Sequence, residues 1–314
     1  MMTNGDMSRL GVYLYGNTLR IVEAQTENDT FKVVRIAETE TDVPLDLKKL
    51  DDQTVYPAFV SAINNLVEKK GIMPGSANLA LDHRMVIEQI ISFDSDLNDS
   101  VLQEHLEWEM NQFLISPRDD YNIDYEQITS LKSGLDRYLV VAVRKKLIKF
   151  LTDVFNKSIL NLTKIDLDKL AAVRALEKIQ PQNGVVALVD CEDKNYDITL
   201  VYNGKFLLSE AVNYSDNELQ SEDVNQVSKD LNELLNRLVG RINDSIHMDS
   251  FHTVYFFGDK FNRKLLNEFE KLSNSYQAVY LNPFQELQLE LDLESQNLVQ
   301  QYSERFLYCL GMVV

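Results

Sequence analysis

The chain has 314 residues, of which 45% are hydrophobic and 25% charged, the balance of a globular protein long enough for two domains. Its formal charge is −18, so its surface repels phosphate backbones and nucleic acid is excluded as a main partner. Two cysteines without paired spacing exclude a disulfide framework and a zinc ribbon. We find no apolar signal segment and no apolar run of about 18 residues. We therefore expect a cytoplasmic protein without direct membrane insertion.

The first part of the chain predicts three short strands, then an amphipathic helix and a further strand. The strands are residues 10–14, 19–24 and 31–37, and the later strand is 77–81. The helix has one apolar face, formed by Val55, Phe59, Ile63, Leu66 and Val67. Gly71 follows the helix where a left-handed cap is expected.

Residues 84–160 predict a compact insert. Its elements are a strand at 86–93, a helix capped by Asp99 and running to residue 114, strands at 121–128 and 138–143, and a helix at 147–155. A strand at 162–165 and a helix at 169–179 then complete the first half.

The second half begins with the same pattern. Three strands at 185–189, 197–202 and 205–211, the last two joined by the tight turn Asn203-Gly204, precede a long helix with its apolar side between Val227 and Ile242. The remaining elements are a strand at 254–257, a helix at 260–272, a strand at 278–281 and a last helix at 299–310, with a loop predicted after Pro283.

The repeat of a three-strand meander, a helix and a strand predicts an α/β protein with two similar lobes and a cleft between them. This is the plan of the actin, hexokinase and heat-shock ATPase superfamily, which has a ribonuclease H-like fold. We expect the first lobe at 1–183, with the insert at 84–160, and the second lobe at 184–314.

The first hairpin resembles that of the PilM family of type IV pilus assembly proteins. That family reads Gly-hydrophobic-Asp-hydrophobic-Gly, small residues, a basic residue and Val-Glu, and this chain has matching residues at Gly11, Thr18, Arg20, Val22 and Glu23. Tyr13 stands in place of the aspartate, and Tyr15 in place of the second glycine. Further resemblances lie at 108–117, 140–144, 165–166, 282–284 and 310–311, so the similarity covers most of the chain.

The second hairpin and the segment that would admit adenosine match the family in part. Asp190 is kept, but Glu192 replaces a glycine; Gly258 is kept, but Asp259 replaces a second glycine. The resemblance implies a nucleotide site, vestigial if present, formed by Gly11, Gly16, Thr18, Asp190 and Gly258. In this site Asp190 would bind a metal ion. ATP and magnesium are disfavoured by Tyr13, Tyr15 and Glu192, because Glu192 would repel a triphosphate and the tyrosines would fill its turn.

Plainer interpretations of these residues stay open. Tyr13 and Tyr15 would also pack on one face of a strand, Asp190 would also cap a turn, and Gly258 would also serve a strand-to-helix turn. No histidine has the spacing of a metal ligand, so we expect no metal site built on histidine.

The resemblance implies an actin-like scaffold that binds the N-terminal cytoplasmic tail of a single-span membrane protein, which recruits it to the inner membrane. The insert would help to form the peptide groove. Efficient ATP hydrolysis is not expected. The alternatives are a working ATPase and a polymerising protein similar to FtsA, and self-association stays open.

Overall fold

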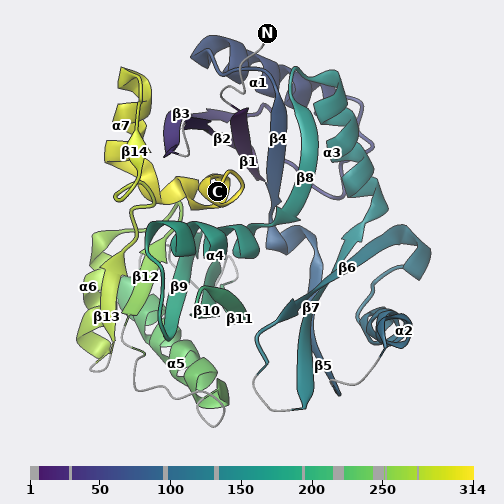
Figure 1. The fold of residues 1–314 in the computed structure, drawn as a ribbon, viewed down its shortest axis with the longest axis vertical. Helices are drawn as coiled ribbons and strands as arrows, with labels where there is room; N and C mark the ends of the chain where they lie inside the picture. The colour runs from purple at the N-terminus through teal and green to yellow at the C-terminus, as the bar shows by residue number, and fades with distance from the viewer. Residues whose placement is uncertain are drawn as a thin grey trace.

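Three sheets organise the chain, two large and one small (Figure 1). The computed structural model describes residues 7–27, 30–94, 98–130, 134–192, 195–214, 223–242, 251, 253–273 and 276–314. Each large sheet forms one lobe, and the small sheet lies beside them, so the predicted two-lobed arrangement is confirmed.

The first lobe is built on a six-stranded sheet in the order β14-β3-β2-β1-β4-β8. Its strands are β1 (Met7–Tyr15), β2 (Thr18–Glu27), β3 (Thr30–Glu40), β4 (Ser76–Leu81), β8 (Asn161–Leu167) and β14 (Gln288–Leu289). The first three form an antiparallel meander, and β4 runs parallel to β1. The helices α1 (Val55–Lys70) and α3 (Lys145–Lys157) pack on one face through a shared apolar core. Gly71 ends α1 with a left-handed φ of 61°, as predicted.

The second lobe repeats this plan on a five-stranded sheet in the order β11-β10-β9-β12-β13. Its strands are β9 (Val185–Glu192), β10 (Asn195–Tyr202), β11 (Lys205–Asn213), β12 (Thr253–Phe257) and β13 (Gln277–Tyr280). Again the first three form an antiparallel meander and the next strand runs parallel to the first. The helices α5 (Val224–Ile242) and α6 (Arg263–Leu272) bury their apolar sides on this sheet.

The small sheet is antiparallel, in the order β5-β7-β6, and we call it with its helix α2 the insert. The elements are β5 (Ile87–Asp94), α2 (Asp99–Asn111), β6 (Tyr121–Ile128) and β7 (Leu135–Arg144). The prediction that Asp99 caps α2 is wrong: the side chain of Asn98 accepts the hydrogen bond from the Val101 amide. The helix ends three residues before the predicted residue 114.

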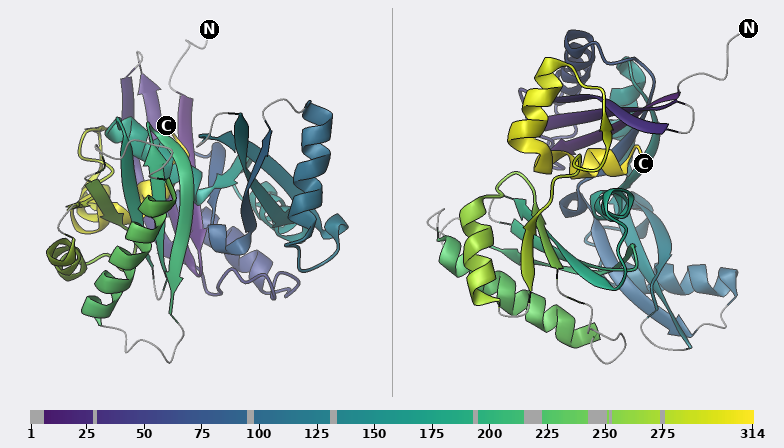
Figure 2. Two further views of the ribbon diagram at one scale, coloured as in Figure 1. Left: turned by 90° about the horizontal axis from the view of Figure 1, so that it is seen from below. Right: turned by 60° about the vertical axis from the view of Figure 1, so that its left-hand side comes forward.

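A central layer joins the two lobes, formed by α4 (Asp168–Ile179) and the C-terminal segment (Figure 2). The helix predicted at 299–310 is two helices, α7 (Leu293–Tyr302) and α8 (Leu307–Gly311), separated by a 3-10 turn, Ser303–Phe306. The hydroxyl of Tyr280 on β13 bonds to Ser303 and Glu304, which holds the chain in this turn. The predicted loop after Pro283 contains the short strand β14. None of the described helices is long and apolar enough to cross a membrane.

Two glycines let α8 enter this layer. A Cβ atom on Gly11 of β1 would lie 1.9 Å from the carbonyl oxygen of Cys309, and one on Gly311 would lie 1.8 Å from that of Ala171 on α4. Since neither backbone oxygen can move without moving a helix, both positions need glycine for the close approach. The buried C-terminal helix therefore determines the residue at Gly11.

Candidate functional site

The carboxyl ends of β1 and β9 face each other between the lobes, where the sequence predicts the nucleotide site. Tyr13 is fully buried and its ring packs 4.8 Å from that of Tyr308 on α8, centroid to centroid. Tyr15 stacks beside Tyr13 at 6.4 Å. The tyrosine rings therefore fill the place where the family has an aspartate and a glycine. The Tyr13 hydroxyl is buried and has no hydrogen-bond partner among the described residues.

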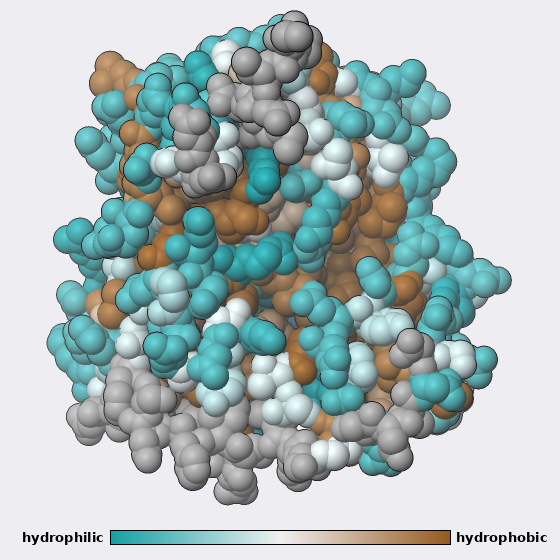
Figure 3. Space-filling model, viewed as in Figure 1, coloured by the Kyte–Doolittle hydropathy of each residue, from teal (hydrophilic) through white to brown (hydrophobic). Residues whose placement is uncertain are grey.

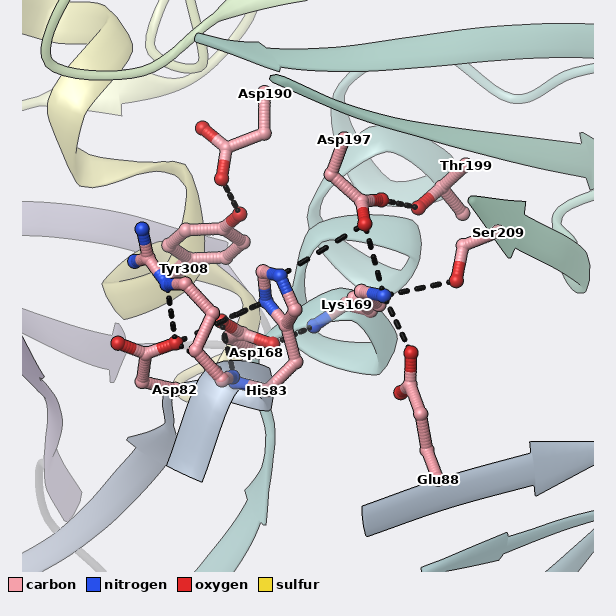
Figure 4. Close-up of polar contacts among 11 residues, drawn as sticks. Asp82, His83, Glu88, Asp168, Lys169, Asp190, Asp197, Thr199, Ser209 and Tyr308 are labelled. Carbon is pink, nitrogen blue, oxygen red and sulfur yellow. Dashed lines mark hydrogen bonds and ion pairs between the residues drawn. The ribbon is translucent and has the colours of Figure 1, made fainter. Parts of the chain in front are cut away.

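The second lobe contributes two buried carboxyl groups, Asp190 and Glu192. Asp190 Oδ2 accepts a hydrogen bond of 2.5 Å from the Tyr308 hydroxyl, which links the lobe to α8 (Figure 4). Burial raises the pKa of Asp190 to about 7, and it also raises the pKa of Glu192, with the neighbouring Asp190 adding to the effect. These groups are thus held in an environment that disfavours added negative charge.

Arg84 provides the positive charge beside these acids. Its Nε donates to Asp82 Oδ1 at 2.8 Å, and its guanidinium carbon lies 3.9 Å from the centroid of the Tyr15 ring. Its charge favours the ionised forms of Asp190 and Glu192, opposing the effect of burial. A side chain of the chain itself therefore supplies positive charge beside these two carboxyl groups.

His83 and Lys169 connect all three sheets. His83 Nδ1 lies 2.9 Å from Asp168 Oδ2 at the start of α4. Lys169 Nζ lies 3.0 Å from Asp197 Oδ2 on β10 and 2.6 Å from Glu88 Oε1 on β5 (Figure 4). Burial lowers the pKa of His83, but the Asp168 carboxylate outweighs it and raises the pKa to about 9.

Asp82, His83 and Asp168 are close enough together to hold one metal ion. The two carboxylates already have other partners, however. Asp82 binds Arg84, while Asp168 accepts hydrogen bonds from the backbone amide of His83 and from that of Lys169. The arrangement fits a network of ion pairs that joins β4, α4 and β10 better than an open ligand set.

Arg20 pairs with Asp259, which lies in the segment where the sequence predicts adenosine binding. This arginine is 2% exposed, and it donates to Glu38 at 2.5 Å and to Asp259 at 2.7 Å. Asp259 follows β12 of the second lobe, so the pair with Asp259 crosses between the lobes. Gly258, with a φ of 103°, packs against β9: a Cβ atom there would lie 2.5 Å from Asp190 Oδ1.

The remaining predicted nucleotide residues lie along the first hairpin. Gly16, with a φ of 56°, forms the turn between β1 and β2, and Thr18 pairs with Tyr15 at its base. Gly11 lies farther down β1, against Cys309. The structure thus brings Asp190 and Gly258 together, while Gly11 serves the packing of α8.

Sequence reasoning missed Arg84, Asp168 and Lys169, and it gave His83 no role. The available signal was the run Asp82-His83-Arg84, three polar residues directly after a buried strand. Its partners come from 168–169 and 190–197, so only the fold reveals that they meet.

A groove lies between the first lobe and the insert, with a volume of about 390 Å³. Its walls are mostly apolar and come from β4, β6, β7, α3, β8 and α4; the lining includes Leu81, Val86, Leu139, Val141, Val143, Ile148, Ile165, Leu167 and Leu170. Figure 3 shows apolar side chains gathered in the hollow between the upper lobe and the insert. This volume lies in the range of about 300–1,000 Å³ of ligand pockets.

Acidic side chains and two end strands border the groove. Asp124 and Glu126 are exposed on β6, and neither forms an ion pair within the described part of the chain. Asp166 on β8 is paired with Lys164 and Arg174. Both β6 and β8 are the last strands of their sheets, so each has one edge not paired in the described structure. The groove can therefore offer backbone hydrogen bonds, apolar pockets and negative charge together.

A family profile described as "Type IV pilus assembly protein PilM" matches residues 11–234. No curated protein matches the sequence.

Solved structures show the same fold. A structure titled "PilM-PilN type IV pilus biogenesis complex" is 16% identical, with a TM-score of 0.71, and the match covers 98% of each chain. A Bacteroides thetaiotaomicron protein described as having an actin-like ATPase fold and unknown function is 13% identical, with a TM-score of 0.50, covering 93% of this chain and 95% of that one. The predicted actin-like fold is confirmed. Because the PilM profile matches well over half of the sequence, the chain belongs to the family of the type IV pilus assembly protein PilM.

Proposed function

We propose that this protein is a scaffold that holds the N-terminal cytoplasmic tail of a single-span membrane protein, similar to PilN, in the groove between its first lobe and its insert. The observation that carries the proposal is the groove itself, with its apolar walls, acidic border and unpaired strand edges. The tail brings the protein to the inner membrane from the cytoplasm.

The residues that line the groove indicate which conformation and which residue types the bound tail has. An extended segment adds to the edge of β6 or β8 through main-chain hydrogen bonds, and its apolar side chains enter the hollow lined by Val141 and Leu170. Basic residues in the tail pair with Asp124 and Glu126, and the net charge of −18 speeds the encounter.

We further propose that the protein works without ATP hydrolysis. The residues between the lobes do not fit magnesium and a triphosphate: Tyr13 replaces the acid, Arg84 takes the position of positive charge, and Glu192 adds a buried carboxyl group. Holding a tail needs no chemical step, so this agrees with a scaffold.

The test is a titration with a synthetic peptide that carries the cytoplasmic tail of the PilN-like protein. We expect saturable binding that weakens as salt increases. Val141→Lys places a charge on the groove floor and should weaken binding about tenfold or more, while the matched Leu272→Lys, on the exposed side of α6, should not. Equal binding by wild-type protein and a folded Val141→Lys variant would exclude this groove.

A further inference from the structure

The outer side of the insert exposes three large apolar side chains at the end of α2. Trp108 is 63% exposed, Phe113 47% and Ile115 82%, and Trp108 is the single tryptophan of the chain. Figure 2 shows α2 on the side of the insert that faces away from both lobes. We call these three residues, which lie within eight positions of the chain, the apolar cluster. Exposed apolar side chains that lie close together mark an interaction site, and tryptophan is among the residues most enriched at the energetic centres of interfaces.

The packing of the insert does not need these side chains. The inner face of α2 already covers the small sheet with Leu102, Leu106 and Met110, which are buried. The outer face forms a shallow hollow whose lining follows helical spacing: Ser100, Gln103, Glu104, Glu107, Trp108 and Asn111, with Arg118 at its end. This hollow extends along most of the helix, as a site for a second helix requires.

The charge around the cluster is predominantly negative. Between residues 104 and 120 the acids are Glu104, Glu107, Glu109, Asp119 and Asp120, and the range contains one arginine, Arg118, one histidine, His105, and no lysine. Arg118 is itself paired with Glu107 at 2.8 Å. An apolar cluster inside such an acidic border complements a segment that carries both apolar and basic residues, and it repels anionic lipid and a second copy of the same surface.

We propose that the outer face of α2 is a docking surface for a basic amphipathic helix of a protein partner, with Trp108 as its central contact. The surface is separate from the groove. Along β7, Val140 and Ala142 point toward α2, while Val141 and Val143 line the groove on the opposite face. The insert can therefore hold two partners at once.

The position of Trp108 makes intrinsic fluorescence a direct probe. The protein is titrated with a synthetic amphipathic helix of leucine and lysine, and separately with its counterpart in which every lysine is glutamate. We expect the basic peptide to shift the tryptophan emission to shorter wavelength, to saturate, and to bind more weakly in high salt. The acidic counterpart should cause no shift. Equal shifts with both peptides would overturn the proposal.

Two variants test whether the basic peptide binds at the outer face of α2. Phe113→Ser with Ile115→Ser should weaken binding about tenfold, whereas Leu293→Ser, which removes an exposed leucine of α7 in another acidic segment, should leave it unchanged. Unchanged binding by the double variant would refute the surface. So would an emission shift produced by raising the protein concentration alone or by anionic vesicles. The double variant should still bind the tail peptide in the groove, so failure here and failure of the groove proposal are distinguishable.

Discussion

The family pattern suggests that Asp190 binds a metal ion, whereas in the structure Asp190 forms a buried hydrogen bond with Tyr308. Its carboxyl group is buried, accepts one hydrogen bond from Tyr308, and has a second oxygen without a partner among the described residues. A pKa of about 7 means that near neutral pH a large share of the Asp190 carboxyl is protonated. Such a group stabilises the fold as an acid and costs stability as an anion.

We predict that Asp190→Asn stabilises the protein increasingly as the pH rises. The folded-state pKa of about 7 lies above the usual 3.8, so the contribution of Asp190 is fully present below about pH 3.8 and is lost as the pH rises through 7. Asparagine keeps the acceptor for Tyr308 but cannot ionise. The midpoint of denaturant unfolding should therefore increase more at about pH 8 than at about pH 5.5.

The exposed Asp119→Asn serves as the matched control, and its effect on the midpoint should be similar at the two pH values. A loss of stability at high pH in Asp190→Asn would mean that the ionised carboxylate is paired with Arg84, and the interpretation would be wrong.

At the scale of elements, α4 is the helix that ties the three sheets together. Its first residues are buried and charged: Asp168 holds His83 of the first lobe, and Lys169 reaches both β10 and β5. The same helix lines the groove with Leu170. The position of the insert relative to the second lobe therefore depends on the start of this helix.

We predict that Lys169→Met destabilises the protein by about 3–5 kcal/mol, because it removes the 3.0 Å ion pair of the buried Asp197 and leaves that carboxylate with the longer contact of 3.8 Å to His83. Denaturant unfolding measures the loss. The control is Lys149→Met on α3, whose pair with Asp153 is exposed and should contribute less than about 1 kcal/mol. A similar small effect for both variants would contradict a structural role of the Lys169 network.

At the scale of the whole molecule, the lobes are held together in the region where the sequence predicts a nucleotide site. The Arg20–Asp259 ion pair, the hydrogen bond from Tyr308 to Asp190 and the shared core around α4 and α8 all contribute to this boundary. Opening the site would break these contacts, so a ligand would have to supply more binding energy than in a preformed cleft.

We therefore expect no saturable heat when the protein is titrated with magnesium and ATP in a calorimeter. The variant Tyr15→Gly with Glu192→Gly removes two obstructing side chains without adding a charge, and it should bind MgATP more tightly than the wild-type protein if they obstruct the site. Micromolar binding with steady turnover by the wild type would contradict the scaffold without ATPase activity.

The sequence by itself determined the elements and their repeat, because each depends on local periodicity and turn residues. The strands of both meanders, the apolar face of α1 and its cap at Gly71 were predicted in this way. Of the predictions that were wrong, the cap at Asp99 failed locally, because the neighbouring Asn98 caps α2 instead. The helix predicted at 299–310 failed where distant contacts occur, since Tyr280 bonds to Ser303 and Glu304 in the turn that separates α7 from α8.

Only the tertiary structure decided what contacts the candidate site residues make. Gly11 matched a family pattern, but the carbonyl oxygen of Cys309, 298 positions later in the chain, is what requires glycine there. Likewise His83, Asp168 and Asp197 belong to three separate segments, and no spacing along the chain indicates that they meet. Periodicity is a property of neighbours, whereas burial, charge pairing and close backbone approach arise between segments that only the fold brings together.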